Sequence, residues 1–433
     1  MSYHSGVQLA PEPTAESALP WKRTLVLSGM ALLAIVLFFS YVRRPGDFIG
    51  YAAAGNAVLT GADIYNDTPP GLNNWPPFFS LLCVPLALMD RVSPYFARGF
   101  WIILNYGVLL LILDMVSRLV YGRRLTLGGA NETVSLASSA ILIPLVLTLP
   151  FLLYHFLYHQ VNLIIFALTL RALMLQENGR GFLGGLSLGL AAAMKVMPVL
   201  FVPYLAYRGR WKPALYALAA TVAFSVSPSV VFGPHRFWLD FNTWLTICRQ
   251  NPWGTGSANQ SVYAMWDRFL GHGIVPFVSP GTFFLPMSGD PRVRIVWMLS
   301  IALTGVFVLL AFRGRHPLGS VTSHLEWSVV FLISAIFGPV GWKHYLVVLI
   351  LANALLYALY RSEEIEAGTR RALGVVLLIY FLLSLSTSHD LVGRSLAQRF
   401  ETGAVITYAA LILLAGLLWI RYQLSTREIP TAL

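Results

Sequence analysis

Long apolar segments separated by short polar ones recur along almost the whole chain, beginning at Thr24. A bilayer core about 30 Å thick requires roughly 20 apolar helical residues to cross it. Ten segments approach or reach this length and predict membrane helices: 24–42, 96–117, 134–153, 161–176, 212–232, 293–312, 325–338, 342–360, 371–388 and 402–421. The pattern therefore predicts an all-α polytopic membrane protein.

Two further apolar segments do not fit a single straight span. Residues 77–89 are short and contain Pro85, whereas residues 181–206 are long and contain Lys195 and Pro198 near the middle. If the first lies on the membrane surface and the second is a hairpin of two short helices, the Lys and Arg clusters fall on the cytoplasmic side, as is usual. We therefore predict about twelve membrane helices with both termini in the cytoplasm.

This topology places one transmembrane domain over residues 21–421. A flexible cytoplasmic tail over 1–20 precedes it, and a cytoplasmic tail over 422–433 follows it. Two long loops, 43–95 and 233–292, then face outward, and their many Trp, Gly and Pro residues favour surface helices over idle linkers. The first apolar segment has no small-residue cleavage site at its end, so we expect it to be retained.

Composition supports a membrane protein and excludes other classes. Hydrophobic residues make up 57% of the 433 residues and charged residues 11%, against about 25% charged in soluble domains. The net charge of +11 is spread in small groups between apolar segments, which argues against nucleic-acid binding. Cys83 and Cys248 have no metal-ligand spacing, and whether they pair is left open.

Lys195 lies inside an apolar segment, where a charge costs a few kcal/mol unless it is paired or reaches water. Broken helices at membrane depth occur where they line a cavity. A positive charge at such a break suits an anionic phosphate. The alternative is a lysine that extends from a helix end to the membrane interface.

Asp47 directly follows the first predicted span and precedes an Ala- and Gly-rich segment that begins at Tyr51. A carboxylate at the outer rim of the membrane can accept the proton of a sugar hydroxyl as a general base. The alternative is an aspartate that caps the next helix. Asp63 and Asp67 are candidate ligands for a divalent cation, although a lone Asp47 does not require one.

Two other polar groups fall on the same predicted outer face. The first contains His155, His159, Gln160 and Asn162; the two histidines share a helix face, but no third metal ligand accompanies them. Hydrogen bonding to sugar or phosphate is the more economical interpretation, with helix capping as the alternative. The second group contains Trp342, Lys343 and His344 at a helix start, together with Asn259 and Gln260 of the second loop.

These segments, taken in order, resemble glycosyltransferase family 87, which has the GT-C membrane fold. The resemblance covers roughly residues 43–350 and rests on these matching segments: Asp47–Tyr51, Gly61–Tyr65, Trp75–Phe78, Gln160–Asn162, Lys195–Pro198, Asn259–Ser261 and Trp342–His344. The chain departs from the family pattern at Trp75, where a Tyr is frequent, and at His159, where a Gly commonly precedes the Gln.

The resemblance implies an inverting glycosyltransferase with a polyprenyl-phosphate sugar donor, most often mannose, and a lipid or glycan acceptor. Asp47 matches the expected base, with no cofactor required and a divalent cation optional. We assign the donor phosphate to Lys195, Lys343 and His344. The expected sugar and acceptor ligands are Tyr51, His159, Gln160, Asn162, Asn259, Gln260 and Trp342.

Three other functions stay open at this point. An arabinofuranose or other sugar donor with a polymer acceptor would use the same site. A lipid flippase or transporter is a second alternative, although most polar groups gather at one face instead of at mid-membrane. A scaffold without catalysis is the third. We expect the protein in the bacterial inner membrane, in contact with membrane lipids and with its site facing outward.

Overall fold

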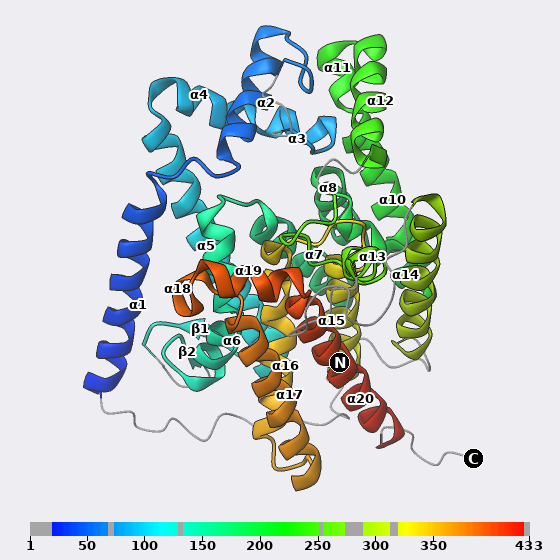
Figure 1. The fold of residues 1–433 in the computed structure, drawn as a ribbon. Coiled ribbons are helices and arrows are strands. Elements are labelled where there is room, and N and C mark those ends of the chain that lie inside the picture. The colour runs from blue at the N-terminus through cyan, green and yellow to red at the C-terminus, as the bar shows by residue number, and fades with distance from the viewer. Residues whose placement is uncertain are drawn as a thin grey trace. The chain divides into compact units, whose positions relative to one another are not determined.

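The computed structural model describes residues 20–67, 73–128, 133–250, 254–272, 289–311 and 319–427, and these are mostly helical (Figure 1). Within these ranges, eight helices are long and apolar enough to cross a membrane. A multi-pass membrane protein is thereby supported, whereas the total of twelve membrane helices stays a prediction. The predicted tail over 1–20 lies outside the described residues except for its last residue.

The long helices follow the predicted spans closely. They are α1 (Pro20–Tyr41), α5 (Pro94–Tyr121), α6 (Ser139–Leu157), α7 (Asn162–Glu177), α10 (Trp211–Val226), α14 (Gly289–Ala311), α15 (Val321–Ile336), α16 (Leu349–Arg361), α17 (Ala367–Leu385) and α20 (Val405–Arg427). The span predicted at 134–153 started too early, because its first residues form strand β2 (Thr133–Ser135). This strand pairs in parallel with β1 (Arg124–Thr126).

The two ambiguous segments are both broken. The first forms α3 (Pro77–Leu82) and α4 (Val84–Val92), separated at Cys83. The second forms α8 (Gly181–Met194), the 3₁₀ helix η1 (Met197–Leu200) and α9 (Phe201–Tyr207). The backbone of Lys195 is extended, with φ −156° and ψ 127°, so the predicted helix break is present.

The chain divides into two compact units, each described here by itself. The Asp47 unit consists of Thr24–Met115 and Leu153–Pro252, and the Lys343 unit of Met1–Arg23, Val116–Leu152 and Trp253–Leu433. The single domain predicted over 21–421 stays a prediction.

In the Asp47 unit, α8 packs against α7 and α10. A Cβ atom added to Gly189 of α8 would lie 2.4 Å from the Cβ of Ala220 in α10, so glycine allows the close approach of the two helices. This packing fixes the helix that ends at Lys195. Because lipid offers no hydrophobic drive between helices, close packing of small residues is an important source of stability.

The helices of the first predicted loop and those after α10 gather at one end of the Asp47 unit (Figure 1). These are α2 (Phe48–Thr60), α3 and α4, with α11 (Pro228–Phe232) and α12 (Pro234–Gln250). Ile64 and Tyr65 pack against Phe232 and Trp244. The Asp63 carboxylate lies 3.8 Å from the Arg236 guanidinium. Both loops predicted at this face therefore contribute folded helices.

The Lys343 unit is built around α15, α16, α17 and α20. A fully buried ion pair joins two of them, with the Arg421 guanidinium 2.8 Å from the Glu326 carboxylate. Shorter elements complete the unit: α13 (Val262–His272), the 3₁₀ helix η2 (Lys343–Val348), α18 (His389–Val392) and α19 (Arg394–Thr402).

Candidate active site

Asp47 precedes the first residue of α2 but does not cap that helix with its side chain. Its carboxylate instead accepts a hydrogen bond from the Gln160 side-chain amide. Its backbone N–H donates to the carbonyl of Tyr158 at 3.0 Å. Asp47 is thus held against residues 158–160. It occupies the N-cap position of α2, but its side chain makes no capping hydrogen bond.

Gly46 makes this approach possible. Its φ is +50°, in the left-handed region that favours glycine. A Cβ atom at this position would lie 2.8 Å from the His159 Nδ1 and 2.9 Å from the Tyr158 carbonyl oxygen. Any other residue would push the two segments apart and move Asp47 away from Gln160.

The pKa of Asp47 is raised above its ordinary value because the carboxylate is desolvated by burial. The Gln160 hydrogen bond and the Lys195 charge both oppose this rise. The side chain is partly exposed. A carboxylate with a raised pKa, stabilised by a donor and a nearby cation, has the chemistry of a general base.

Lys195 forms a hydrogen bond with Asn162, which lies two residues after Gln160 in the chain. Its ammonium donates to the Asn162 side-chain oxygen at 2.9 Å. Asn162 is the first residue of α7 and is buried, whereas Lys195 is partly exposed at the helix break. The ammonium group of this lysine is therefore hydrogen-bonded to a buried residue of the protein, while its distance from the membrane interface is not tested.

The segment Gln160-Val161-Asn162 consequently contacts both predicted catalytic charges. Gln160 holds Asp47, Asn162 holds Lys195, and Val161 between them is fully buried in the apolar core of the unit. Four residues predicted from sequence thus form one connected group. In this group, Gln160 and Asn162 are hydrogen-bond partners of charged residues. Their predicted contacts with a sugar stay a prediction.

His155 and His159 lie just before Gln160 in the chain, and their side chains have different surroundings. The Nε2 of His155 lies 3.2 Å from the Asn105 side-chain oxygen. His159 is buried, and its carbonyl accepts from the Trp101 indole at 2.8 Å. Neither ring nitrogen has a hydrogen-bond partner among the residues that the structure describes. Burial and the charge of Arg98 lower the pKa of His159 to about 4, so its imidazole is neutral at neutral pH.

Tyr51, the remaining predicted ligand of this unit, is fully buried in α2. Its ring packs against the rings of Trp75, Phe79 and Trp101 at centroid distances of 4.7 to 5.6 Å. The tyrosine therefore supports the turn that carries Asp47, and its predicted contact with a sugar stays a prediction.

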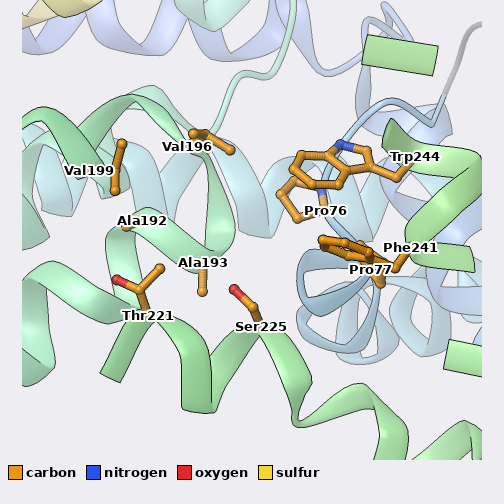
Figure 2. Close-up of a pocket in the computed structure, with 10 residues that line it drawn as sticks. All are labelled: Pro76, Pro77, Ala192, Ala193, Val196, Val199, Thr221, Ser225, Phe241 and Trp244. Atoms are coloured by element: carbon orange, nitrogen blue, oxygen red, sulfur yellow. The ribbon is translucent and has the colours of Figure 1, made fainter. Parts of the chain in front are cut away.

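An apolar cavity of about 80 Å³ lies beside the helix break of Lys195. In Figure 2, the α8 and η1 side contributes Ala193 and Val196, and the opposite side contributes Pro76 and Trp244. The complete lining is Pro76, Pro77, Ala192, Ala193, Val196, Val199, Thr221, Ser225, Phe241 and Trp244. Val196, which follows Lys195 in the chain, lines the cavity, whereas Lys195 is not among the lining residues. An apolar cavity of this kind suits the apolar part of a ligand.

The predicted site residues of the Lys343 unit form a separate group. The Lys343 ammonium pairs with the Glu401 carboxylate and donates to the Thr387 carbonyl at 2.8 Å. The His389 Nε2 lies 3.4 Å from the same carboxylate. The positive charge of Lys343 is therefore compensated within the protein, a constraint that its predicted phosphate role has to accommodate.

Asn259 and Gln260 join loops within this unit. The Asn259 amide donates to the carbonyls of Gly254 and Pro339, both at 3.0 Å, and its oxygen accepts from the backbone of Ser261 and Gly341. The Gln260 amide donates to the Glu401 carbonyl at 2.8 Å. These contacts organise the turn before Trp342.

Trp342 and His344 follow directly on that turn. Their rings are stacked, with centroids 6.4 Å apart and planes inclined by 20°. His344 is buried, and its ring also contacts Tyr345. The predicted contact of Trp342 with a sugar and the predicted contact of His344 with the donor phosphate both stay predictions.

Asp63 and Asp67, the candidate cation ligands, both accept hydrogen bonds from backbone N–H groups. The Asp63 carboxylate accepts from the backbone of Tyr65 and Asn66 at 2.9 Å, and Asp67 accepts from the Asp63 backbone at 2.7 Å. Among the described residues, no three His, Cys, Asp or Glu side chains gather as a metal site. The two cysteines are free thiols, Cys83 buried and Cys248 exposed.

Sequence reasoning missed Glu401, Asn105 and Trp101. A lysine near a predicted span implied an acidic partner, but nothing in the sequence selected Glu401 from the 19 acidic residues. Asn105 and Trp101 occupy an apolar helix, where a buried asparagine was the available signal. All three act by holding residues that the sequence had singled out.

Residues 74–339 match glycosyltransferase family 87. This range includes Gln160, Asn162 and Lys195, whereas Asp47 and Lys343 lie outside it. Among curated proteins, the chain is 25% identical over 395 residues to a polyprenol-phosphate-mannose-dependent alpha-(1-2)-phosphatidylinositol mannoside mannosyltransferase of Mycolicibacterium smegmatis. That alignment covers 85% of this chain and 82% of the relative.

A second relative from the same organism is a polyprenol-phosphate-mannose-dependent alpha-(1-2)-phosphatidylinositol pentamannoside mannosyltransferase. It is 32% identical over 203 residues, which are 45% of this chain and 42% of the relative. Among solved structures, the chain is similar to ArnT from Cupriavidus metallidurans bound to undecaprenyl phosphate. That match has 14% identity and a TM-score of 0.43, and covers 95% of this chain and 79% of ArnT.

Proposed function

Because the chain belongs to glycosyltransferase family 87, we propose that it transfers mannose from a polyprenyl-phosphate donor to a lipid or glycolipid acceptor. The reaction takes place at the outer face of the bacterial inner membrane, in a domain of the GT-C type. The observation that carries the proposal is the pairing of Asp47 and Lys195 with neighbouring residues of one motif, beside an apolar cavity. Mannose is favoured by the names of the two relatives.

The proposed reaction is a single displacement with inversion. Asp47 takes the proton of the acceptor hydroxyl while the hydroxyl oxygen forms a bond to the anomeric carbon of the sugar. The bond from that carbon to the phosphate oxygen breaks, and the lipid phosphate leaves with the electron pair. A partly buried carboxylate whose pKa is raised is a stronger base than an ordinary aspartate.

Lys195 is proposed to stabilise the charge that develops on the leaving phosphate. A preorganised charge at the position where negative charge develops is commonly the largest electrostatic contribution to catalysis. Asn162 already fixes the ammonium group, so little reorganisation is needed during the reaction. Lys343 and His344 are proposed as further phosphate contacts, in which case the phosphate competes with Glu401 for Lys343.

The cavity beside Lys195 is proposed to receive isoprene units next to the donor phosphate. Its lining is apolar apart from the hydroxyl groups of Thr221 and Ser225 and the indole nitrogen of Trp244 (Figure 2). An apolar pocket lined by Val196, the residue that follows Lys195 in the chain, matches a lipid phosphate better than a nucleotide sugar. Of the predicted partners, this supports the polyprenyl-phosphate donor most directly.

The test is transfer from labelled polyprenyl-phosphate mannose by the purified protein in liposomes that contain a lipid extract with phosphatidylinositol mannosides. We expect a labelled lipid product, formed at least about 100-fold more slowly by the Asp47→Asn variant. Transfer only from polyprenyl-phosphate arabinofuranose would replace mannose as the sugar. Translocation of the donor without transfer would instead identify a flippase and overturn the proposal.

A further inference from the structure

The motif Gln160-Val161-Asn162 is placed to set the positions of two charged residues at once. Gln160 lies directly before α7, and its backbone N–H donates to the His155 carbonyl at 3.0 Å. Val161 is fully buried in the apolar core, and Asn162 begins the helix. Three consecutive residues anchored in this way leave little freedom in the positions of the two amide groups.

The amides and the charges differ in exposure. Gln160 and Asn162 retain 2% and 5% of their accessible surface. Asp47 and Lys195 are both partly exposed. The residues that carry the charges are therefore more accessible than the residues whose amides hold them.

We propose that Gln160 and Asn162 are positioning residues, which act through the charged side chains that they hold. Gln160 orients Asp47 as the base, and Asn162 orients Lys195 toward the donor phosphate. The inference rests on the proposed function, because it assumes these roles for Asp47 and Lys195.

The direction of the first hydrogen bond selects one oxygen of the base. The Gln160 amide donates to Oδ2 of Asp47, and an amide N–H cannot receive the proton that the base collects. The amide occupies one acceptor position of Oδ2, and we therefore assign proton uptake from the acceptor hydroxyl to Oδ1. A donor to the carboxylate also favours its ionised form, which opposes the effect of burial.

The second hydrogen bond sets the direction of the lysine. A lysine side chain has four methylene groups and much rotamer freedom, which a single contact at its end removes. The Asn162 oxygen accepts one of the three ammonium hydrogens at 2.9 Å, which fixes the position of the ammonium group. An ammonium group held at a fixed position suits the binding of a phosphate oxygen.

The experiment tests Gln160 and Asn162 separately, each by a property that can be measured without sugar transfer. Infrared spectroscopy across a pH series follows protonation of Asp47, with Asp47→Asn to assign the band. Binding of polyprenyl phosphate without sugar follows the Lys195 side. We expect Gln160→Leu to raise the pKa of Asp47 by about 1 to 2 pH units and to leave lipid phosphate binding unchanged.

Asn162→Ala should give the opposite pattern. We expect polyprenyl phosphate binding to weaken about three- to tenfold, with a smaller change in the Asp47 titration than Gln160→Leu gives, because Lys195 acts on Asp47 only through its charge. Gln176→Leu is the matched control, because Gln176 is a buried amide on the same helix, and it should change neither property. An unchanged Asp47 titration in Gln160→Leu, or unchanged binding in Asn162→Ala, would overturn the inference.

Loss of both properties in proportion to lowered thermal stability would also overturn it, since that is the result of a purely structural role. A different variant tests the proposed function independently of the positioning roles. If Lys195→Ala binds polyprenyl phosphate as tightly as the wild type, Lys195 has no phosphate role, whatever the titration of Gln160→Leu shows.

Discussion

The Lys343 ammonium and the Glu401 carboxylate form an ion pair in which the two side chains retain only 8% and 9% of their exposure. Two charges removed from water in this way stabilise each other, but each is costly when left alone. The pair ties the start of η2 to α19 within one unit.

Replacement of one member of this pair should therefore destabilise the unit more than replacement of both. We expect Lys343→Met to lower the free energy of unfolding by about 3 to 5 kcal/mol, because it leaves Glu401 buried without its main partner. The Lys343→Met, Glu401→Met double variant should recover most of this loss. Denaturant unfolding in detergent micelles measures both, and equal stability of Lys343→Met and wild type would contradict the prediction.

Asp47→Asn should abolish the base while preserving shape. We expect kcat to fall about 10² to 10⁴-fold, the usual contribution of general base catalysis, with little change in the KM for donor. Asp90→Asn on α4 is the control and should retain wild-type turnover, since Asp90 lies in none of the site contacts. A purified Asp47→Asn enzyme with near-normal kcat would remove Asp47 from the mechanism.

The pH dependence of the wild type should reflect the raised pKa of Asp47. The base acts only when ionised, so activity is present above its pKa and is lost as the pH falls through it. Because burial raises this pKa, the acidic limb of kcat/KM should lie at higher pH than for an ordinary aspartate. A limb at or below the ordinary value of 3.8 would contradict the assignment.

His159 adopts φ +54°, in the left-handed region that L side chains rarely enter. This conformation explains why glycine is compatible with the position, as in the family pattern. We expect His159→Gly to be more stable than His159→Ala by about 1 kcal/mol, because alanine keeps the backbone strain and glycine removes it.

The control for this comparison is Asn242, an exposed residue within the helix α12. There the order should reverse, with Asn242→Ala more stable than Asn242→Gly by about 1 kcal/mol. Thermal unfolding of the four variants provides the measurement. If alanine is the more stable replacement at both positions, the left-handed backbone of His159 is not a source of strain.

Filling the cavity should distinguish donors by their lipid. Ser225→Phe places a ring in the apolar cavity, and we expect it to raise the KM for a long-chain polyprenyl-phosphate donor about tenfold. A donor with a single isoprene-type unit should be less affected, and Ser225→Ala should behave as the wild type with both. Equal effects of Ser225→Phe on the two donors would exclude the cavity as a lipid site.

Much of the fold followed from local features of the chain. The long helices agree with the predicted spans because crossing a bilayer demands apolar helical segments of fixed length, a requirement visible in hydropathy alone. The break at Lys195 was equally visible, since a charge and a nearby proline both oppose a continuous apolar helix. At 134–138 the apolar pattern misled, because apolar residues of a short strand and of a helix look alike.

The sequence by itself determined the membrane character, the helix break and the residue types able to do the chemistry, because each depends on neighbours close along the chain. Only the tertiary structure decided the partners. Gln160 meets Asp47 across 113 residues, and Glu401 meets Lys343, through the path of the chain between them. A charged residue in an apolar segment indicates that a partner is required, but only the geometry of the folded protein determines which residue that partner is.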